Sequence, residues 1–304
     1  MNQLPGYEDC SLCPRNCHVD RNIVRGYCKC GQNLKIARAA LHYWEEPCIS
    51  GGNGSGTVFF SGCTLKCCFC QNFNISSEGF GEEITVERLS EIFLELQEKG
   101  ANNINLVTAT QYLPSVLEAL DQVRGKLKIP VVYNCGGYEK KETIEALKGY
   151  VDIFLPDLKY HDPELSKVYS KAEDYFEVAS EAVKTMIEMT GAPEFDENGI
   201  MKKGVIIRHM ILPGCYKDSM YLLHWIKENL PENGFLLSLM SQYTPFYKSY
   251  LYPKINRRLT TYEYEKVLDE AIRLGLENGY MQEKSSAKEE YTPPFDLQGV
   301  KKES

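Results

Sequence analysis

From residue 57 onward, the chain alternates short runs of β-branched and aromatic residues with longer stretches of helical periodicity. In the first pair, residues 57–62 form an apolar run, and residues 86–96 repeat apolar side chains at helical spacing between Thr85, a fair N-cap, and the stop at Gly100. Repeated strand–helix pairs produce parallel strands joined by right-handed crossovers. The sequence therefore predicts an α/β fold of six strand–helix units, which are 57–62 with 86–96, 103–108 with 116–123, 131–134 with 141–147, 152–157 with 175–189, 205–212 with 220–229 and 235–241 with 263–274.

Six units are fewer than the eight that close a full barrel of this kind. We therefore expect a partial (β/α)6 TIM-like barrel, with its reactive residues in the loops at the carboxyl ends of the strands. A doubly wound parallel sheet is the structural alternative. Residues 195–200 place Asp-Glu-Asn-Gly between apolar flanks, which is typical of a hairpin insertion.

The twelve cysteines are concentrated toward the amino terminus, since all but Cys135 and Cys215 precede Asn72. The first residues lack the basic start and apolar stretch of a secretion signal, so we expect a cytoplasmic protein whose thiols stay reduced. Reduced cysteines at this density indicate metal binding rather than disulfides. We divide the chain into a cysteine-rich N-terminal module (residues 1–50), a barrel domain (51–282) and a C-terminal extension (283–304), in which 283–290 and 301–304 are predicted as loop and tail.

The composition disfavours two classes of partner. A net charge of −8 over 304 residues argues against a large basic surface for nucleic acid or anionic lipid. No apolar run reaches the roughly 18 residues that span a bilayer. We therefore expect neither nucleic acid nor a membrane among the partners.

Cys63, Cys67 and Cys70 follow directly after the first predicted strand, where a barrel places its reactive loops. The Cys-x3-Cys-x2-Cys spacing lets three thiolates bind three irons of a [4Fe–4S] cubane and leaves the fourth iron without a protein ligand. The alternatives are a structural zinc site or a fully ligated cluster, for which spacing alone leaves Cys135 and Cys215 as fourth ligands. The sequence favours an iron–sulfur site with one open iron.

A second group of cysteines lies within residues 10–30. These five thiolates suffice for a zinc ion or an auxiliary iron–sulfur cluster, which spacing does not distinguish. Reduced cysteines without any ligand role are the alternative. We predict a second metal, for which the first choice of ligands is Cys10, Cys13, Cys17 and Cys28, with Cys30 as the fifth thiol.

The three loop cysteines belong to a longer motif. Residues 54–72, which contain Gly-Cys-Thr-Leu-Lys-Cys-Cys-Phe-Cys-Gln-Asn, resemble the cluster segment of pyruvate formate-lyase activating enzymes of the radical S-adenosylmethionine (SAM) superfamily. Residues 10–17, 39–51 and 208–214 resemble the PflX-type subgroup of those activases. The resemblance implies that SAM chelates the open iron through its amino and carboxylate groups. Reductive cleavage of SAM then yields a 5′-deoxyadenosyl radical.

The resemblance also implies a reaction and partners. It implies an oxidoreductase that activates a glycyl-radical enzyme by removing a hydrogen atom from a glycine of that partner, with flavodoxin or ferredoxin as the electron donor. The cluster motif specifies how the radical is made and not where it goes. A radical SAM enzyme that acts on another peptide or on a small molecule is therefore the first alternative. A non-enzymatic iron–sulfur electron carrier is the second.

Contacts to SAM are implied at the ends of several predicted strands. Phe69 would contact the adenine, and Asn134 follows the third strand at a position that binds SAM in activases. Asp157 and Lys159, after the fourth strand, match a motif that holds the SAM carboxylate, for which a lysine ammonium is a suitable donor.

The sequence departs from the activase pattern after the second predicted strand. Activases commonly carry Gly-Gly-Glu there to hold the SAM amino group, whereas residues 108–112 read Thr-Ala-Thr-Gln-Tyr. Thr108, Thr110 and Gln111 offer oxygens to an ammonium group and are predicted as substitutes. His209 lies within a predicted strand, where it faces either the SAM cavity or the core.

Overall fold

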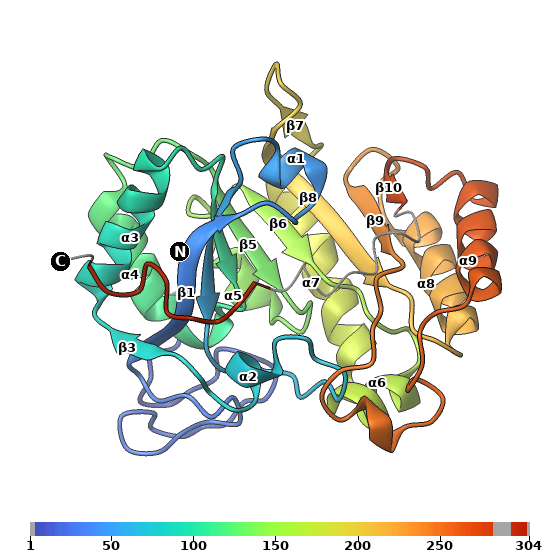
Figure 1. The fold of residues 1–304 in the computed structure, drawn as a ribbon, viewed down its shortest axis with the longest axis horizontal. Coiled ribbons are helices and arrows are strands. Elements are labelled where there is room, and N and C mark those ends of the chain that lie inside the picture. Colours follow the sequence, from blue (N-terminus) through green and yellow to red (C-terminus); the bar gives the residue numbers. More distant parts are fainter. Residues whose placement is uncertain (1–3, 282–292, 303–304) are drawn as a thin grey trace.

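A computed structural model describes residues 4–281 and 293–302. Its centre is a mostly parallel sheet of order β10-β9-β8-β6-β5-β4-β2-β1-β3, in which β7 pairs with β8 (Figure 1). Only the β1–β2, β1–β3 and β7–β8 pairs of the described strands are antiparallel. The strands are β1 (Leu34–His42), β2 (Ser55–Phe60), β3 (Glu82–Ile84), β4 (Ile104–Val107), β5 (Val131–Cys135), β6 (Ile153–Pro156), β7 (Glu194–Phe195), β8 (Met201–Met210), β9 (Leu236–Met240) and β10 (Gly279–Met281).

Helices follow the parallel strands and cover the outer face of the sheet, where the largest apolar core lies (Figure 1). The first long helix begins after Thr85, whose hydroxyl accepts a 3.2 Å hydrogen bond from the amide of Arg88, as an N-cap does. The helices are α1 (Pro47–Ser50), α2 (Phe73–Ser76), α3 (Val86–Glu98), α4 (Leu113–Val123), α5 (Lys141–Glu145), α6 (Pro163–Ser170), α7 (Tyr175–Thr190), α8 (Tyr216–Asn229) and α9 (Thr261–Arg273), with 3-10 turns η1 (Thr110–Tyr112) and η2 (Ser249–Leu251).

The predicted α/β partial barrel is confirmed. The six predicted strands correspond to β2, β4, β5, β6, β8 and β9, and each is followed by a helix. In the described part of the chain, the sheet ends at β3 and β10, which do not pair, so the barrel is open. The predicted hairpin is confirmed by the antiparallel pairing of β7 with β8. Among the described residues, no helix is long and apolar enough to cross a membrane.

The sequence patterns did not reveal β1, β3, β10 or α6. Strand β1 lies in the central sheet beside β2, although its residues belong to the predicted module of residues 1–50. It contains three alanines, which are weak β formers, and its register shifts between Ile36 and Arg38. Because the bulge interrupts the alternation of side chains, pairing with β2 rather than local propensity places this strand. The division of the chain into three segments stays a prediction.

The described part of the C-terminal extension packs against β1. The amide of Leu297 donates to the carbonyl of Ala37 at 3.0 Å, and the amide of Ala39 donates to the carbonyl of Gln298 at 2.8 Å. Val300 is completely buried. The predicted loop at 283–290 lies outside the described residues, as do residues 303 and 304 of the predicted tail.

The inner face of the sheet has an apolar half and a polar half. Near the amino ends of the strands, inward side chains such as Val132, Ile153 and Ile206 pack on Cys48 and Ile49 of α1. Side chains alternate along a strand, so the next inward positions on β5 and β8, two residues on, are polar and border a cavity. Helix α1 therefore closes the inner face at one end and leaves the carboxyl ends of the strands for the site.

Candidate functional site

A cavity of about 770 Å³ lies on the inner face of the sheet, at the carboxyl ends of the parallel strands. It runs from the cluster loop (residues 63–70) to the segment that contains α1. Eight of the residues predicted from the sequence line it, namely Cys63, Cys67, Cys70, Phe69, Thr108, Asn134, Asp157 and Lys159. The structure thus brings together residues that are spread over almost 100 positions of the chain.

The cluster loop is held by backbone hydrogen bonds to distant segments. The amide of Cys68 donates to the carbonyl of Tyr169 at 2.8 Å, and the amide of Lys248 donates to the carbonyl of Cys68 at 2.8 Å. Cys68 is buried and does not line the cavity. The loop therefore presents three of its four thiols to the cavity.

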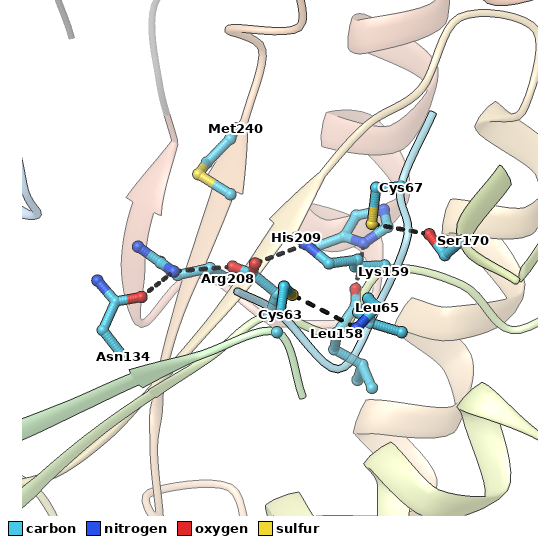
Figure 2. Close-up of polar contacts among 12 residues, drawn as sticks. Cys63, Leu65, Cys67, Asn134, Leu158, Lys159, Ser170, Arg208, His209 and Met240 are labelled. Carbon is cyan, nitrogen blue, oxygen red and sulfur yellow. Dashed lines mark hydrogen bonds and ion pairs between the residues drawn. The ribbon is translucent and has the colours of Figure 1, made fainter. Parts of the chain in front are cut away.

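All three of these thiols have polar partners close by, and Figure 2 shows those of Cys63 and Cys67. The Sγ atom of Cys67 lies 3.0 Å from the hydroxyl of Ser170, at the end of α6. The Sγ atom of Cys63 accepts a 3.4 Å hydrogen bond from the amide of Leu65. Hydrogen bonds of this kind orient the sulfur atoms and stabilise negative charge on them.

The thiols of Cys63 and Cys70 are costly to ionise. Burial, followed by the nearby Cys67 and Cys70 thiolates, raises the pKa of Cys63 to about 12. Burial and Cys67 also raise the pKa of Cys70 to about 11. A metal group that binds all three as thiolates would add positive charge to that of Lys159, which does not by itself offset the burial of these thiols.

The arrangement of the three cysteines fits a cluster better than a single zinc ion. Among residues 4–281 and 293–302, no three Cys, His, Asp or Glu side chains converge on the position of one metal ion. A cubane does not require such convergence, because each thiolate binds a different iron. Three partly buried thiols from one loop that line one cavity are a suitable donor set for a [4Fe–4S] cluster.

A buried ion pair lies beside the cluster loop. The Nζ atom of Lys159 is 2.6 Å from one carboxylate oxygen of Asp157, and the other oxygen is 3.0 Å from a guanidinium nitrogen of Arg208. Burial alone would raise the pKa of Asp157, but the charges of Arg208 and Lys159 lower it below its ordinary value. Burial likewise works against the charge of Lys159, whose pKa is nevertheless raised, first by Asp157 and then by Cys67. Lys159 is therefore a stable ammonium next to the predicted cluster.

Arg208 extends this network across the inner face of the sheet (Figure 2). It donates to the side-chain oxygen of Asn134 at 2.6 Å and forms a 3.3 Å ion pair with Glu45. Asn134 in turn donates to Glu45 at 3.3 Å. Arg208 and Glu45 were not among the predicted site residues. The inward register of β8 could have indicated Arg208, whereas Glu45 follows no predicted strand and only the fold brings it here.

Thr108, Thr110 and Gln111, the residues predicted in place of Gly-Gly-Glu, differ in their position relative to the cavity. Thr108 lines the cavity with φ +59, a conformation that is strained for a β-branched residue. Gln111 lies behind the cavity, where its amide donates to the carbonyls of Thr108 and Ser61 at 2.8 and 3.0 Å. Thr110 also lies behind it and donates to Glu139 at 3.0 Å. Gln111 therefore supports the segment that leads to the cluster loop, and of the three only Thr108 reaches the cavity.

His209 points away from the cavity, because residues 208 and 210 of β8 face inward and residue 209 faces the helices. Its Nδ1 atom donates to the carbonyl of Leu158 at 2.7 Å (Figure 2). Its Nε2 atom lies 2.8 Å from the hydroxyl of Ser219 on α8. Burial lowers the pKa of His209 to about 4. It is a neutral core histidine whose position excludes a direct contact with a ligand in the cavity.

The N-terminal cysteine segment (residues 10–30) is arranged around a buried arginine. The guanidinium of Arg21 donates to the carbonyls of Cys30, Gly31 and Gln111 at 3.2, 2.5 and 2.5 Å, and lies 3.8 Å from the sulfur of Cys10. Within the part of the chain that the structure describes, no three metal-binding side chains converge here either. A second metal is therefore not shown.

Comparison with known proteins identifies a family for most of the sheet. The Radical SAM superfamily model matches residues 57–214, which include the cluster loop and strands β4 to β8. An uncharacterized protein of Methanocaldococcus jannaschii is 31% identical over 285 residues, which cover 89% of this chain and 76% of that protein.

Three solved structures are similar to the chain at low identity. SuiB of Streptococcus suis bound to S-adenosylmethionine is 16% identical, with a TM-score of 0.49 over 73% of this chain and 48% of that chain. Methylornithine synthase (PylB) is 14% identical, with a TM-score of 0.48 over 69% and 59% of the two chains. The FeFe-hydrogenase maturase HydG from Carboxydothermus hydrogenoformans is 14% identical, with a TM-score of 0.48 over 71% and 50%. The chain thus spans about half the length of these solved structures.

Proposed function

Because the chain belongs to the radical SAM superfamily, we propose that Cys63, Cys67 and Cys70 bind a [4Fe–4S] cluster with one open iron, and that the enzyme cleaves SAM reductively. The observation that carries the proposal is that these three thiols and the ammonium of Lys159 line one cavity. When bound, such a cluster supplies one electron to the sulfonium of SAM, and the broken C–S bond leaves a 5′-deoxyadenosyl radical.

The side chains around the cluster loop bind and orient SAM. Lys159 donates to the SAM carboxylate, and Asp157 holds the ammonium of Lys159 in place through its 2.6 Å ion pair. Phe69 is 4% exposed and contacts Tyr243 edge to face, with 5.8 Å between the ring centroids, so its ring is fixed beside the third cysteine. Its position suits contact with the adenine.

The substrate we propose is a glycine of a glycyl-radical enzyme, as in the activases that the sequence resembles. The support is the resemblance over residues 54–72 together with that of residues 10–17, 39–51 and 208–214. Flavodoxin or ferredoxin is the proposed electron donor. The alternative is a radical SAM enzyme that acts on another peptide or on a small molecule. Such an enzyme would have the same cluster and the same SAM contacts, and only the hydrogen donor would differ.

The central test uses anaerobically reconstituted protein, reduced with dithionite in the presence of SAM. We expect stoichiometric or greater formation of 5′-deoxyadenosine and methionine, and a change in the electron paramagnetic resonance (EPR) spectrum of the reduced cluster when SAM binds. An electron carrier with a fully ligated cluster would show neither. A purified glycyl-radical enzyme added to the reaction then tests the substrate, since activation produces a protein-centred glycyl radical that EPR detects.

A further inference from the structure

The cavity has a second end that the cluster and SAM do not explain. We call it the inner end and define it by Glu45, Glu46 and Ser238, which come from the segment before α1 and from β9. Glu46 is 8% exposed and Ser238 is 1% exposed, yet both line the cavity. The inner end is therefore a buried polar surface that faces the same space as the cluster loop.

Two buried oxygen atoms at the inner end have no well-aligned hydrogen-bond partner within the described residues, although the Ser238 hydroxyl lies close enough to Glu46 to oppose the rise of its pKa. They are Oε2 of Glu46 and Oγ of Ser238. A buried polar atom without a partner costs about 1–3 kcal/mol, so such atoms in a cavity usually indicate where a ligand is held. The carboxylate oxygen accepts only, and the hydroxyl also accepts, so the two atoms together suit a ligand that donates.

The charges of the cavity point to a cationic ligand. Three carboxylates, those of the buried Glu46 and the partly buried Glu45 and Asp157, line the cavity with two cations, Lys159 and Arg208. Arg208 pairs with Glu45 at 3.3 Å and with Asp157 at 3.0 Å, and Lys159 pairs with Asp157 at 2.6 Å. Glu46 forms no ion pair in the parts of the chain that the structure describes. Burial raises the pKa of Glu46, and the charge of Arg208, which Glu46 shares with Glu45 and Asp157, offsets only part of this rise, so a further positive charge at the inner end would stabilise its carboxylate.

The walls beside the inner end are apolar and adaptable. The same cavity is lined by Met210 and Met240, the inward residues at the ends of β8 and β9, and by Tyr280 and Met281 on β10. Figure 2 shows Met240 on the same side of the sheet as Arg208. Methionine side chains pack around alkyl groups of varied shape. The surroundings therefore fit an alkyl chain that ends in a cation.

We propose that the inner end binds the primary ammonium or guanidinium group of an alkyl chain on the molecule that donates the hydrogen atom, through Glu46 and Ser238. The identification of this molecule as the hydrogen donor rests on the proposed function. The amino group of SAM is the other available ammonium. It shares one carbon atom with the SAM carboxylate, which Lys159 is expected to hold, and Lys159 is paired with Asp157 rather than with Glu45 or Glu46. A separate molecule is therefore the better match.

The binding test uses the cluster-loaded protein with SAM and two pairs of probes that differ only in charge. The free pair is pentylamine and pentan-1-ol, and the peptide pair is Nα-acetyl-lysine amide and Nα-acetyl-norleucine amide. We expect calorimetry to show that the charged member of at least one pair binds about tenfold or more tightly than the neutral one. Stronger binding of the lysine amide than of pentylamine assigns the cation to a peptide side chain, and the reverse order assigns it to a free amine.

Variants connect that preference to the inner end. Glu46→Gln keeps the size of the side chain and is expected to abolish the charge preference, whereas Ser238→Ala is expected to reduce it by about threefold. Glu194→Gln, on the exposed strand β7, is the matched control and should retain it. Iron content and thermal unfolding show whether each variant is folded and loaded.

Three outcomes would overturn the inference. Equal binding of the charged and neutral probes, or no binding of either pair up to about 10 mM, would remove the cation site. Retention of the preference in Glu46→Gln would place the cation elsewhere. A loss of the SAM-induced EPR change in Glu46→Gln would assign Glu46 to SAM. Each of these leaves SAM cleavage by the parent protein intact, so the failure of this inference is distinguishable from the failure of the proposed function.

Discussion

The molecule contains two cysteine-rich regions that look alike in sequence and differ in structure. The cluster loop presents three thiols to a cavity at the carboxyl ends of parallel strands. The N-terminal cysteine segment instead surrounds Arg21, whose guanidinium binds three backbone carbonyls. Cysteine density alone therefore indicates a metal less specifically than the position of the cysteines relative to the sheet.

The two regions also differ in the pKa values of their cysteines. In the cluster loop, burial and neighbouring thiolates raise the pKa of Cys63 to about 12. In the N-terminal segment, a hydrogen bond from Cys30 and the charge of Arg21 outweigh burial and lower the pKa of Cys28 to about 6. Arg21 lies among the thiols of the second region, whereas Lys66 and Lys159 offset only part of the effect of burial in the first. A metal at the second site would share its thiolates with Arg21, and its presence stays a prediction.

The largest expected effect comes from removing the three cluster thiols. Replacement of Cys63, Cys67 and Cys70 by Ala should abolish the iron that the cluster loop binds, about four atoms per chain, and all formation of 5′-deoxyadenosine. Iron analysis and chromatography of the products measure both. Cys215→Ala is the control, since this buried cysteine does not line the cavity. Continued SAM cleavage by the triple variant would contradict the central proposal.

The same triple variant separates the two regions by metal content. If the N-terminal segment binds a metal, the variant should still contain about one zinc ion or an auxiliary cluster after anaerobic reconstitution. Further replacement of Cys10, Cys13, Cys17 and Cys28 by Ala should remove it. Elemental analysis of the triple variant that detects neither zinc nor iron would refute the second site and leave Arg21 as the organising group of this segment.

Arg21→Met tests whether the arginine organises the N-terminal segment. The substitution leaves the carbonyls of Cys30, Gly31 and Gln111 without their buried donor, so the free energy of unfolding should fall by about 3 kcal/mol. Denaturant unfolding measures the change. Arg25→Met, at an exposed position of the same segment, should have little effect. Equal stability of the two variants would mean that metal or packing, rather than Arg21, holds the segment.

Glu139 lies behind the cavity, where the N-terminal segment meets the barrel. Its burial leads us to expect that the free energy of unfolding depends on pH. Burial raises its pKa from 4.5 to about 8, although hydrogen bonds from Thr110 and Tyr133 oppose the shift. The folded chain thus holds this proton more tightly than the unfolded chain. The stability that protonated Glu139 contributes to the folded chain is therefore complete below pH 4.5 and is lost as the pH rises through about 8.

Glu139→Gln should therefore flatten the stability profile. Between about pH 5 and pH 8, the free energy of unfolding of the parent should fall more steeply than that of the variant, by on the order of 3 kcal/mol. Urea unfolding at several pH values measures both slopes. Glu142→Gln, an exposed neighbour, should leave the parent profile unchanged. Parallel profiles for Glu139→Gln and the parent would show that Glu139 ionises normally in the folded chain.

The sequence predicted the fold and the cluster loop well because both depend on local patterns. Alternation of strands and helices located β2, β4, β5, β6, β8 and β9, and with them the edge of the sheet where the cysteines lie. Eight predicted site residues line one cavity for the same reason. Seven of them belong to the cluster loop or follow the end of a strand by at most three residues, and Asn134 is the second-to-last residue of β5.

The remaining site residues depend on register and on long-range packing. The sequence left His209 facing either the cavity or the core, because a shift of one residue along a strand reverses the face, and the register of β8 turns it toward the core. Glu45 and Glu46 reach the cavity only because β1 pairs with β2 and carries the following segment across the inner face. No local pattern encodes that path.

The smallest of these effects, Lys159→Ala, tests the cluster region without removing the cluster. Loss of a charge-assisted hydrogen bond to the SAM carboxylate costs about 1.5–3 kcal/mol, so SAM should bind roughly ten- to a hundredfold more weakly. The iron content should not change, because Lys159 contacts Asp157 and no thiol within hydrogen-bonding distance among the described residues. Titration of the reduced protein with SAM, followed by EPR, measures the affinity, and Lys167→Ala, an exposed lysine on α6, is the control. Asn134→Ala is expected to act in the same direction, although its contacts with Arg208 and Glu45 make part of its effect structural. If Lys159→Ala bound SAM as tightly as the parent, the SAM carboxylate would have to lie elsewhere along the network. Arg208 would then be the remaining cation of the cavity that could hold it, and Thr108 the remaining polar contact at the end of β4.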